Sequence, residues 1–177
     1  MSICQSSTAG YVIFGGYDSN IDDSNLVIFD MNQHHLYSIS VSNIKYAGNT
    51  VANGMTGLID TRTPYLYLPK QVIRSMVSSL SDHYGANCTS LLCSAEHSIF
   101  TGAPIYGRPC GLPSLELFFS DGKNSLRMNL TDYLKPCSST GLYCSWIRES
   151  PHDYAIIGSP ILTKLIVIID REVNQIG

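Results

Sequence analysis

The chain has 177 residues, enough for one domain or two small ones with a core that needs no metal to hold it together. Charged residues make up 14% of it, against about 25% in an average soluble protein, so most of the polar surface must come from uncharged side chains. A net charge of −3 without any basic run excludes an electrostatic surface for nucleic acid or an anionic membrane, and we expect neither as a partner.

Short apolar runs separated by turn residues fill the first 60 positions and predict antiparallel β-structure. These runs lie at 11–14, 26–29, 36–44 and 57–60. From Tyr37 to Ser42, apolar residues alternate strictly with serines, as in a half-buried strand. The pairs Gly48–Asn49 and Asn53–Gly54 bracket a predicted hairpin turn region.

A helix is predicted from about 69 to 84, because apolar residues recur there at helical spacing. Pro69 suits a first helical position, and Gly85 suits the cap after the last turn. The stretch 85–111 has little periodicity and is rich in Cys, Ser, Gly and Pro. We expect it to be a long connection tethered by disulfides.

Strand signals resume in the second half of the chain. Residues 115–119 and 126–130 flank turn residues and predict a hairpin. The runs 154–158 and 165–170 are apolar enough to lie in a sheet covered on both faces. No linker separates two parts, and we expect one domain over 1–177.

The segment 57–69 joins an apolar strand to a polar turn. It reads Gly-Leu-Ile-Asp-Thr-Arg-Thr-Pro-Tyr-Leu-Tyr-Leu-Pro and delivers Asp60, with two threonines, to the turn. It resembles the active-site segment of pepsin-like aspartic proteases, in which two apolar residues precede Asp-Thr-Gly-Thr/Ser. Arg62 stands at the position of the motif glycine.

Five further segments resemble the C-terminal lobe of the same family, in the same order along the chain. They are 11–18, 36–48, 112–117, 156–158 and 168–177. The resemblance covers 10–177 and implies a mainly β fold, a single lobe of the pepsin-like acid protease fold. Such a lobe has antiparallel, barrel-like sheets with one or two short helices.

Members of this family have two lobes that each supply one aspartate, and the flap over the substrate belongs to the first lobe. The resemblance therefore implies that Asp60 is one of two catalytic carboxylates and that an N-terminal lobe, absent from this chain, supplies the other. The two carboxylates share one proton, because two like charges so close cannot both ionise. The charged one takes a proton from water, and the neutral one donates to the substrate carbonyl.

We accordingly expect the C-terminal half of a pepsin-like aspartic endopeptidase, inactive by itself. Its expected partners are the N-terminal lobe, or an equivalent chain, and a polypeptide substrate or ligand. The chain looks like a processed product, a fragment or half of an assembly. A homodimer that joins two Asp60 carboxylates is less favoured, because no flap segment is evident.

The resemblance also assigns the residues around Asp60. Thr61 is expected to reach the opposite lobe, and Thr63 to hydrogen-bond the carboxylate. The apolar-apolar-Gly segment is expected to support the loop, and its members here are Ile156, Ile157 and Gly158.

Arg62 is the main departure from the family pattern and supports an alternative function. A side chain at a glycine position can strain the loop or obstruct the cleft. A guanidinium beside Asp60 would also favour the ionised carboxylate and so oppose the shared proton. The alternative is a catalytically impaired pseudoprotease that acts as a binding or structural module, unless Arg62 points to solvent or to a partner and leaves the loop intact.

Six cysteines suggest an oxidising compartment. Two N-glycosylation sequons, which begin at Asn87 and Asn129, agree with it. We expect the secretory pathway, with an extracellular or a lysosome- or vacuole-like destination. Residues 1–7 lack the features of a signal peptide, so the signal would lie outside this chain.

The resemblance pairs Cys110 with Cys137, and it leaves Cys4 and Cys144 either paired with each other or free. Cys88 and Cys93 could close a smaller loop.

Cys88 and Cys93 also form a C-x4-C-x3-H pattern with His97, but zinc sites prefer a shorter cysteine spacing and a fourth ligand. We expect no metal and no cofactor. Neither a Gly-x-Ser-x-Gly elbow nor a placed Cys-His pair supports a serine or cysteine hydrolase.

Overall fold

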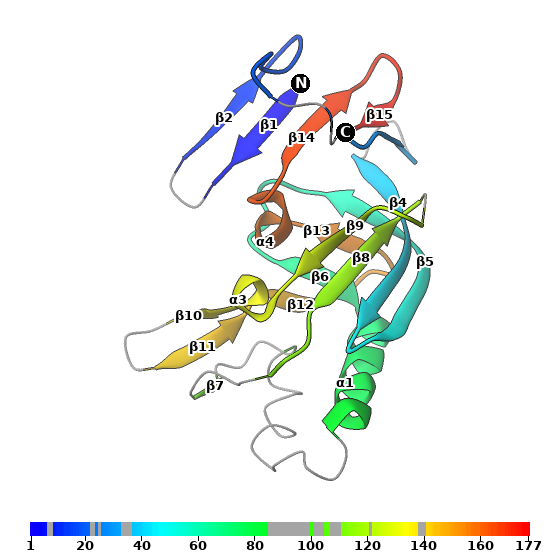
Figure 1. The fold of residues 1–177 in the computed structure, drawn as a ribbon, viewed down its shortest axis with the longest axis vertical. Coiled ribbons are helices and arrows are strands. Elements are labelled where there is room, and N and C mark those ends of the chain that lie inside the picture. Colours follow the sequence, from blue (N-terminus) through cyan, green and yellow to red (C-terminus); the bar gives the residue numbers. More distant parts are fainter. Residues whose placement is uncertain are drawn as a thin grey trace.

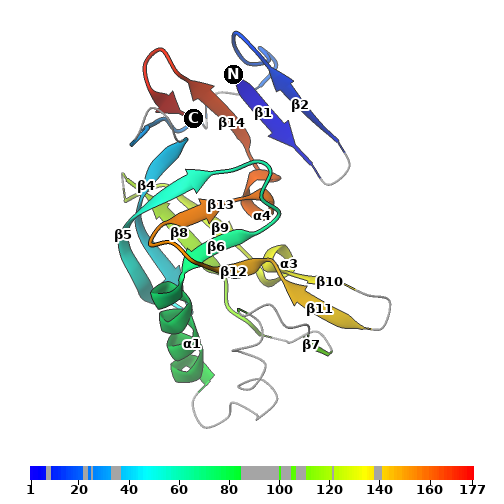
Figure 2. The same ribbon diagram turned by 180° about the vertical axis from the view of Figure 1, so that it is seen from behind.

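The structure is a computed structural model, and strands dominate it (Figure 1). It describes residues 1–6, 9–21, 24, 26–32, 37–84, 100, 105–106, 111–120, 122–137 and 141–177. The strands form sheets of seven, five and three strands. In both views the five-stranded sheet lies at one end of the molecule and the longest described helix at the other (Figures 1 and 2).

The seven-stranded sheet forms the body of the lobe. Its order is β12 (Ile147–Ser150), β6 (Leu66–Pro69), β13 (Ala155–Ile157), β5 (Asn49–Ile59), β4 (Ser38–Tyr46), β8 (Leu115–Phe119) and β9 (Ser125–Met128). Neighbouring strands are antiparallel, except that β13 is parallel to β5 and β12 is parallel to β6. The residues of these strands that face the core are fully buried, among them Val41, Ile44, Leu66, Leu68, Leu115 and Leu117.

The two smaller sheets flank this body. The five-stranded sheet has the order β2 (Gly10–Ile13), β1 (Ser2–Gln5), β14 (Ile166–Asp170), β15 (Gln175–Ile176) and β3 (Phe29–Asp30). The three-stranded sheet has the order β10 (Leu134–Pro136), β11 (Leu142–Ser145) and β7 (Ile105–Tyr106). Both ends of the chain lie beside the five-stranded sheet (Figure 1).

The helices within the described residues are α1 (Lys70–Tyr84), α3 (Leu130–Tyr133) and α4 (Ser159–Leu162). The prediction of α1 is confirmed within one residue at its start, and the predicted stripe packs inward, with Val72, Ile73, Met76 and Leu80 buried. Such burial of one face supplies most of the stability of a helix of this length. Among the described helices, none is long and apolar enough to cross a membrane.

The predicted hairpins are confirmed at β4–β5 and β8–β9, with two local differences. The β4–β5 turn lies at Ala47 and Gly48, whose φ angles of 52° and 80° fit the turns that join twisted strands directly. Asn53 lies within β5, opposite Asn43, so the turn signal at Asn53–Gly54 is wrong. β9 ends at Met128, because the chain enters α3 two residues later.

One of the two terminal apolar runs differs from the prediction in how it is covered. β13 lies in the body, between β5 and β6, with Ala155 and Ile157 buried. β14 lies between β1 and β15, and its alternate residues are only half-buried. The prediction of burial on both faces is therefore wrong for β14, which belongs to an antiparallel sheet rather than to the buried centre of a parallel one.

The disulfide assignment is also corrected. Cys137 is bonded to Cys144, with a Cα–Cα distance of 5.6 Å, and not to Cys110. The antiparallel pairing of β10 with β11 sets Lys135 opposite Cys144 and so brings Cys137 within reach of it. Cys4 is in no disulfide within the described part of the chain. The predictions for Asn87, Cys88, Cys93, His97 and Cys110 concern residues outside the described part of the chain.

Candidate active site

Asp60 follows directly on β5, at the start of a loop that leads into β6. Its backbone N–H donates to the carbonyl of Ile157 at 3.1 Å, and the N–H of Ile59 donates to the carbonyl of Tyr37 at 2.7 Å. Because β13 lies between β5 and β6, the loop passes over the end of β13. Ladder contacts on both sides therefore fix the backbone that carries Asp60.

Gly158 lies beneath this loop and leaves no room for a side chain. A Cβ atom there would lie 2.3 Å from the carbonyl oxygens of both Thr63 and Tyr65. The next residue, Ser159, donates its N–H to the Thr63 carbonyl at 2.9 Å. The structure thus places the segment 156–158 directly against the Asp60 loop, where the resemblance locates its support.

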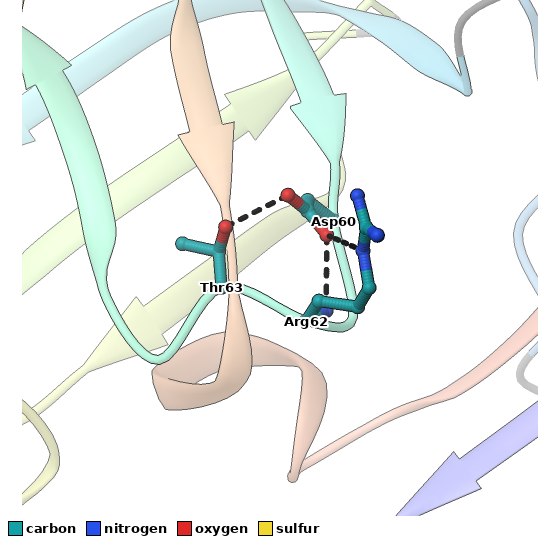
Figure 3. Close-up of polar contacts among 3 residues, drawn as sticks. All are labelled: Asp60, Arg62 and Thr63. Atoms are coloured by element: carbon teal, nitrogen blue, oxygen red, sulfur yellow. Dashed lines mark hydrogen bonds and ion pairs between the residues drawn. The ribbon is translucent and has the colours of Figure 1, made fainter.

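Both carboxylate oxygens of Asp60 accept hydrogen bonds from the loop itself (Figure 3). The Thr63 hydroxyl donates to Oδ2 at 2.8 Å, and the backbone N–H of Arg62 donates to Oδ1 at 2.9 Å. The Asp60 side chain remains 29% exposed. The hydroxyl of Thr61 has no hydrogen-bond partner among the described residues, and this residue faces a surface hollow beside Asp60.

The Arg62 side chain is open to solvent and lies alongside Asp60 (Figure 3). Its side chain is 94% exposed, and its Nε lies 4.0 Å from Asp60 Oδ1. Among the described residues other than glycine, only Ala47 and Asn174 have a positive φ, so Arg62 does not need the torsions that favour glycine. The expected strain at this position is therefore absent, and water screens only part of the exposed charge.

The surroundings of Asp60 have opposing effects on its pKa. Burial, the largest single effect, raises the pKa, but the hydrogen bond from Thr63, that from the Arg62 backbone and the Arg62 charge together lower it below its usual value. The ionised carboxylate consequently stabilises the fold above the unfolded-state pKa of about 3.9. This contribution is lost as the pH falls through the lowered pKa of the folded state.

We expect Thr63→Val to raise the pKa of Asp60 more than Arg62→Ala does, because the Thr63 hydrogen bond lowers the pKa more than the Arg62 charge. NMR titration of the carboxyl carbon of Asp60 measures both changes. Arg74→Ala removes an exposed arginine on α1 and should leave this pKa unchanged. A larger shift in Arg62→Ala than in Thr63→Val would show that the charge dominates.

The hollow beside Asp60 has a volume of about 410 Å³. The loop contributes Asp60, Thr61 and Arg62, and the surrounding strands and their flanks contribute Met1, Ile3, Tyr37, Leu58, Ile59 and Ile169. Asp60 is the one acidic side chain among these lining residues. An ionised carboxylate here can accept a proton from water, but the lining offers no second carboxyl group to act as the acid.

The described residues around Asp60 form no metal-binding cluster. Within the described residues, no three His, Cys, Asp or Glu side chains come together in a group that could hold a metal ion.

Asn129, the one sequon asparagine that the structure describes, is exposed just before α3. Its glycosylation stays a prediction.

A stack of aromatic and basic side chains beside the loop was not predicted as a unit. The Tyr65 ring meets those of Tyr67 and Trp146 edge-on, at 5.8 and 6.4 Å between centroids. Lys135 Nζ lies 4.5 Å from the Trp146 ring centre and Arg148 Cζ lies 4.7 Å from that of Tyr65. Cation–π contacts of this kind each contribute about 0.5–1 kcal/mol at exposed sites. Through these contacts the stack links β6 to β10 and the start of β12.

Comparison with known proteins agrees with this geometry. The sequence profile "Eukaryotic aspartyl protease" matches residues 1–177. Rhizopuspepsin-2 and rhizopuspepsin-4 of Rhizopus niveus are 24% and 26% identical to the chain over 169 residues, which is 94% of it. The match covers 39% and 38% of these relatives, so the chain spans about two fifths of their length.

A solved structure, that of Basic 7S globulin from soybean, superposes with a TM-score of 0.74 and 18% sequence identity. The match covers 99% of this chain and 49% of that one. It supports the fold: a mainly β lobe of the acid protease type.

Proposed function

The chain belongs to the eukaryotic aspartyl protease family, and we propose that it is the C-terminal half of a pepsin-like aspartic endopeptidase in which Asp60 is one of the two catalytic carboxylates. The observation that carries this proposal is the environment of the Asp60 carboxylate. Its carboxylate is held by two donors, is partly exposed and faces a hollow whose lining has no other acid.

Asp60 takes the role of the ionised member of the pair. Hydrogen bonds to both oxygens favour its charged form, as a base toward water requires. The proton donor to the substrate carbonyl then comes from the aspartate of the other lobe. The chain alone is inactive because it supplies the base without the acid.

The missing lobe would lie over the Asp60 hollow and against the five-stranded sheet. β2 is an edge strand of that sheet, and its neighbourhood exposes large apolar side chains: Tyr11 (46%), Val12 (49%) and Phe14 (81%). An apolar edge strand left open invites pairing and aggregation. Since the matched relatives are more than twice as long as the chain, an N-terminal lobe of the same protease is the partner that we propose for this edge.

Hydrolysis of an unfolded protein at acid pH tests the proposal. We expect cleavage when the chain is produced together with its native N-terminal lobe, inhibition by a statine-type compound, and no cleavage by the chain alone. The absence of cleavage by the folded, combined protein would overturn the proposal.

A pseudoprotease is the second candidate, and Arg62 is the observation that favours it. Its guanidinium lies 4.0 Å from Asp60 and opposes the sharing of a proton between two carboxylates. Arg62→Gly in the combined protein separates the two functions. A large gain in hydrolysis favours the pseudoprotease, and unchanged hydrolysis favours the active protease.

We propose a cellular location from the same features. The family and the Cys137–Cys144 disulfide fit the secretory pathway in general, because disulfides persist in oxidising compartments. An extracellular or a lysosome- or vacuole-like destination is our proposal, with Asn129 as an exposed acceptor for a glycan.

A further inference from the structure

We propose that Arg62 makes the site selective for polypeptide ligands that place a carboxylate side chain beside Asp60. The inference rests on the proposed function in one respect: the hollow next to Asp60 is taken as the ligand site. It goes further in naming the chemistry of the ligand and the residue that selects it.

The guanidinium of Arg62 is available to a ligand. Its side chain is 94% exposed, and the edge that bears Nε is the edge that faces Asp60 (Figure 3). Within the described part of the chain, the terminal Nη groups form no hydrogen bond or ion pair. A planar guanidinium whose outer edge is open is suited to bind a carboxylate through two parallel hydrogen bonds.

The negative charge of Asp60 offsets part of this attraction, because its Oδ1 lies 4.0 Å from Arg62 Nε, but it leaves the outer edge of the guanidinium open. Both Asp60 oxygens already accept hydrogen bonds within the loop, and its side chain is 29% exposed against 94% for Arg62. Arg62 is also the one basic side chain among the residues that line the hollow. An approaching carboxylate therefore meets the exposed cation before the shielded anion.

The rest of the hollow suits a side chain with an apolar stem. Its volume of about 410 Å³ lies within the usual range for ligand sites, and its wall includes Ile3, Leu58 and Ile169. The family motif has glycine where this chain has Arg62, and glycine offers no charge to a ligand. The selectivity is thus a property of this chain and not of the motif.

Three peptides that differ at one central position, Glu, Gln or Lys, test the inference against the folded 177-residue chain at about pH 6. Chemical shifts of the Arg62 Nε–H group in NMR titrations give the affinities for the wild type, and backbone amide shifts of the loop give them for the variants. We expect the Glu peptide to bind about twofold to fivefold more tightly than the Gln peptide, as for an exposed ion pair.

Variants at exposed positions assign this preference. Arg62→Ala should abolish it, and Arg62→Glu should transfer it to the Lys peptide. Arg74→Ala removes the same charge from α1, at the end of the molecule away from β1 and β14, and should leave it intact (Figure 1). Equal binding of the Glu and Gln peptides, or a preference that survives Arg62→Ala, would overturn the inference.

The binding assay requires no catalysis, which separates the two proposals. A combined protein that cleaves peptides without any charge preference would remove the inference and leave the proposed function. A preference that follows Arg62 in a protein that does not cleave would support the inference and remove the protease function.

Discussion

Asp60→Asn is expected to lower hydrolysis by the chain together with its N-terminal lobe by about 10²- to 10⁴-fold, the usual contribution of a positioned acid or base. Asn has nearly the same shape as Asp and keeps an oxygen to accept a hydrogen bond from Thr63 or from the Arg62 N–H. It carries no negative charge, however, and cannot take a proton from water. The variant should therefore fold, with some loss of the stability that the ionised carboxylate contributes, and lose the chemistry of the base.

The measurement is kcat/KM for a fluorogenic peptide, together with the thermal unfolding midpoint to confirm the fold. Asp82→Asn is the matched control, because Asp82 is exposed on α1, at the far end of the molecule from β1 and β14 (Figure 2). The control should keep wild-type activity. Equal activity in the two variants would show that Asp60 is not the base.

The sequence predicted the local elements well, since their signals lie within a few residues. The apolar stripe of α1 and the alternation along β4 both depend on the periodicity of one segment. The positions of α1 and β4 follow from this periodicity directly, whereas β5, which carries Asp60, extends through the predicted turn at Asn53–Gly54.

Contacts between distant segments could not be predicted in the same way. The insertion of β13 between β5 and β6, which packs Gly158 under Thr63, depends on tertiary packing rather than on local propensity. The pairing of Cys137 with Cys144 follows from the register of β10 and β11, which six cysteines alone leave open. The errors in disulfide pairing and in the cover of β14 concern such contacts, whereas the turn signal at Asn53–Gly54 failed locally.

The consequence of Arg62 was likewise invisible in the sequence. Residue identity raises the possibility of strain at a glycine position, but only the backbone torsions decide it. Here the loop accepts a side chain without a positive φ, and its N–H still reaches Asp60 at 2.9 Å. Of the two expected effects of Arg62, strain in the loop and a charge beside Asp60, only the charge remains. The peptide titrations and the pKa titration examine this charge separately.

Gly158→Ala should destabilise the protein by about 3 kcal/mol or more, near or above the upper end of the usual cost of overpacking. The added methyl group would meet two backbone carbonyl oxygens at 2.3 Å, and a backbone ladder cannot move aside as a side chain can. For a chain of this size, the midpoint of thermal unfolding should fall by roughly 6–12 °C. Circular dichroism or calorimetry measures this change.

Gly16→Ala provides the comparison, because nothing lies within 4 Å of a Cβ at that position and its φ is not positive. It should change stability by less than about 0.5 kcal/mol. Even where Gly158→Ala leaves a folded population, the displaced loop should weaken the Thr63 hydrogen bond to Asp60 and raise the pKa of this carboxylate. If both variants melted together, with the pKa of Asp60 unchanged, the close contact between β13 and the loop would not be what holds the carboxylate in place.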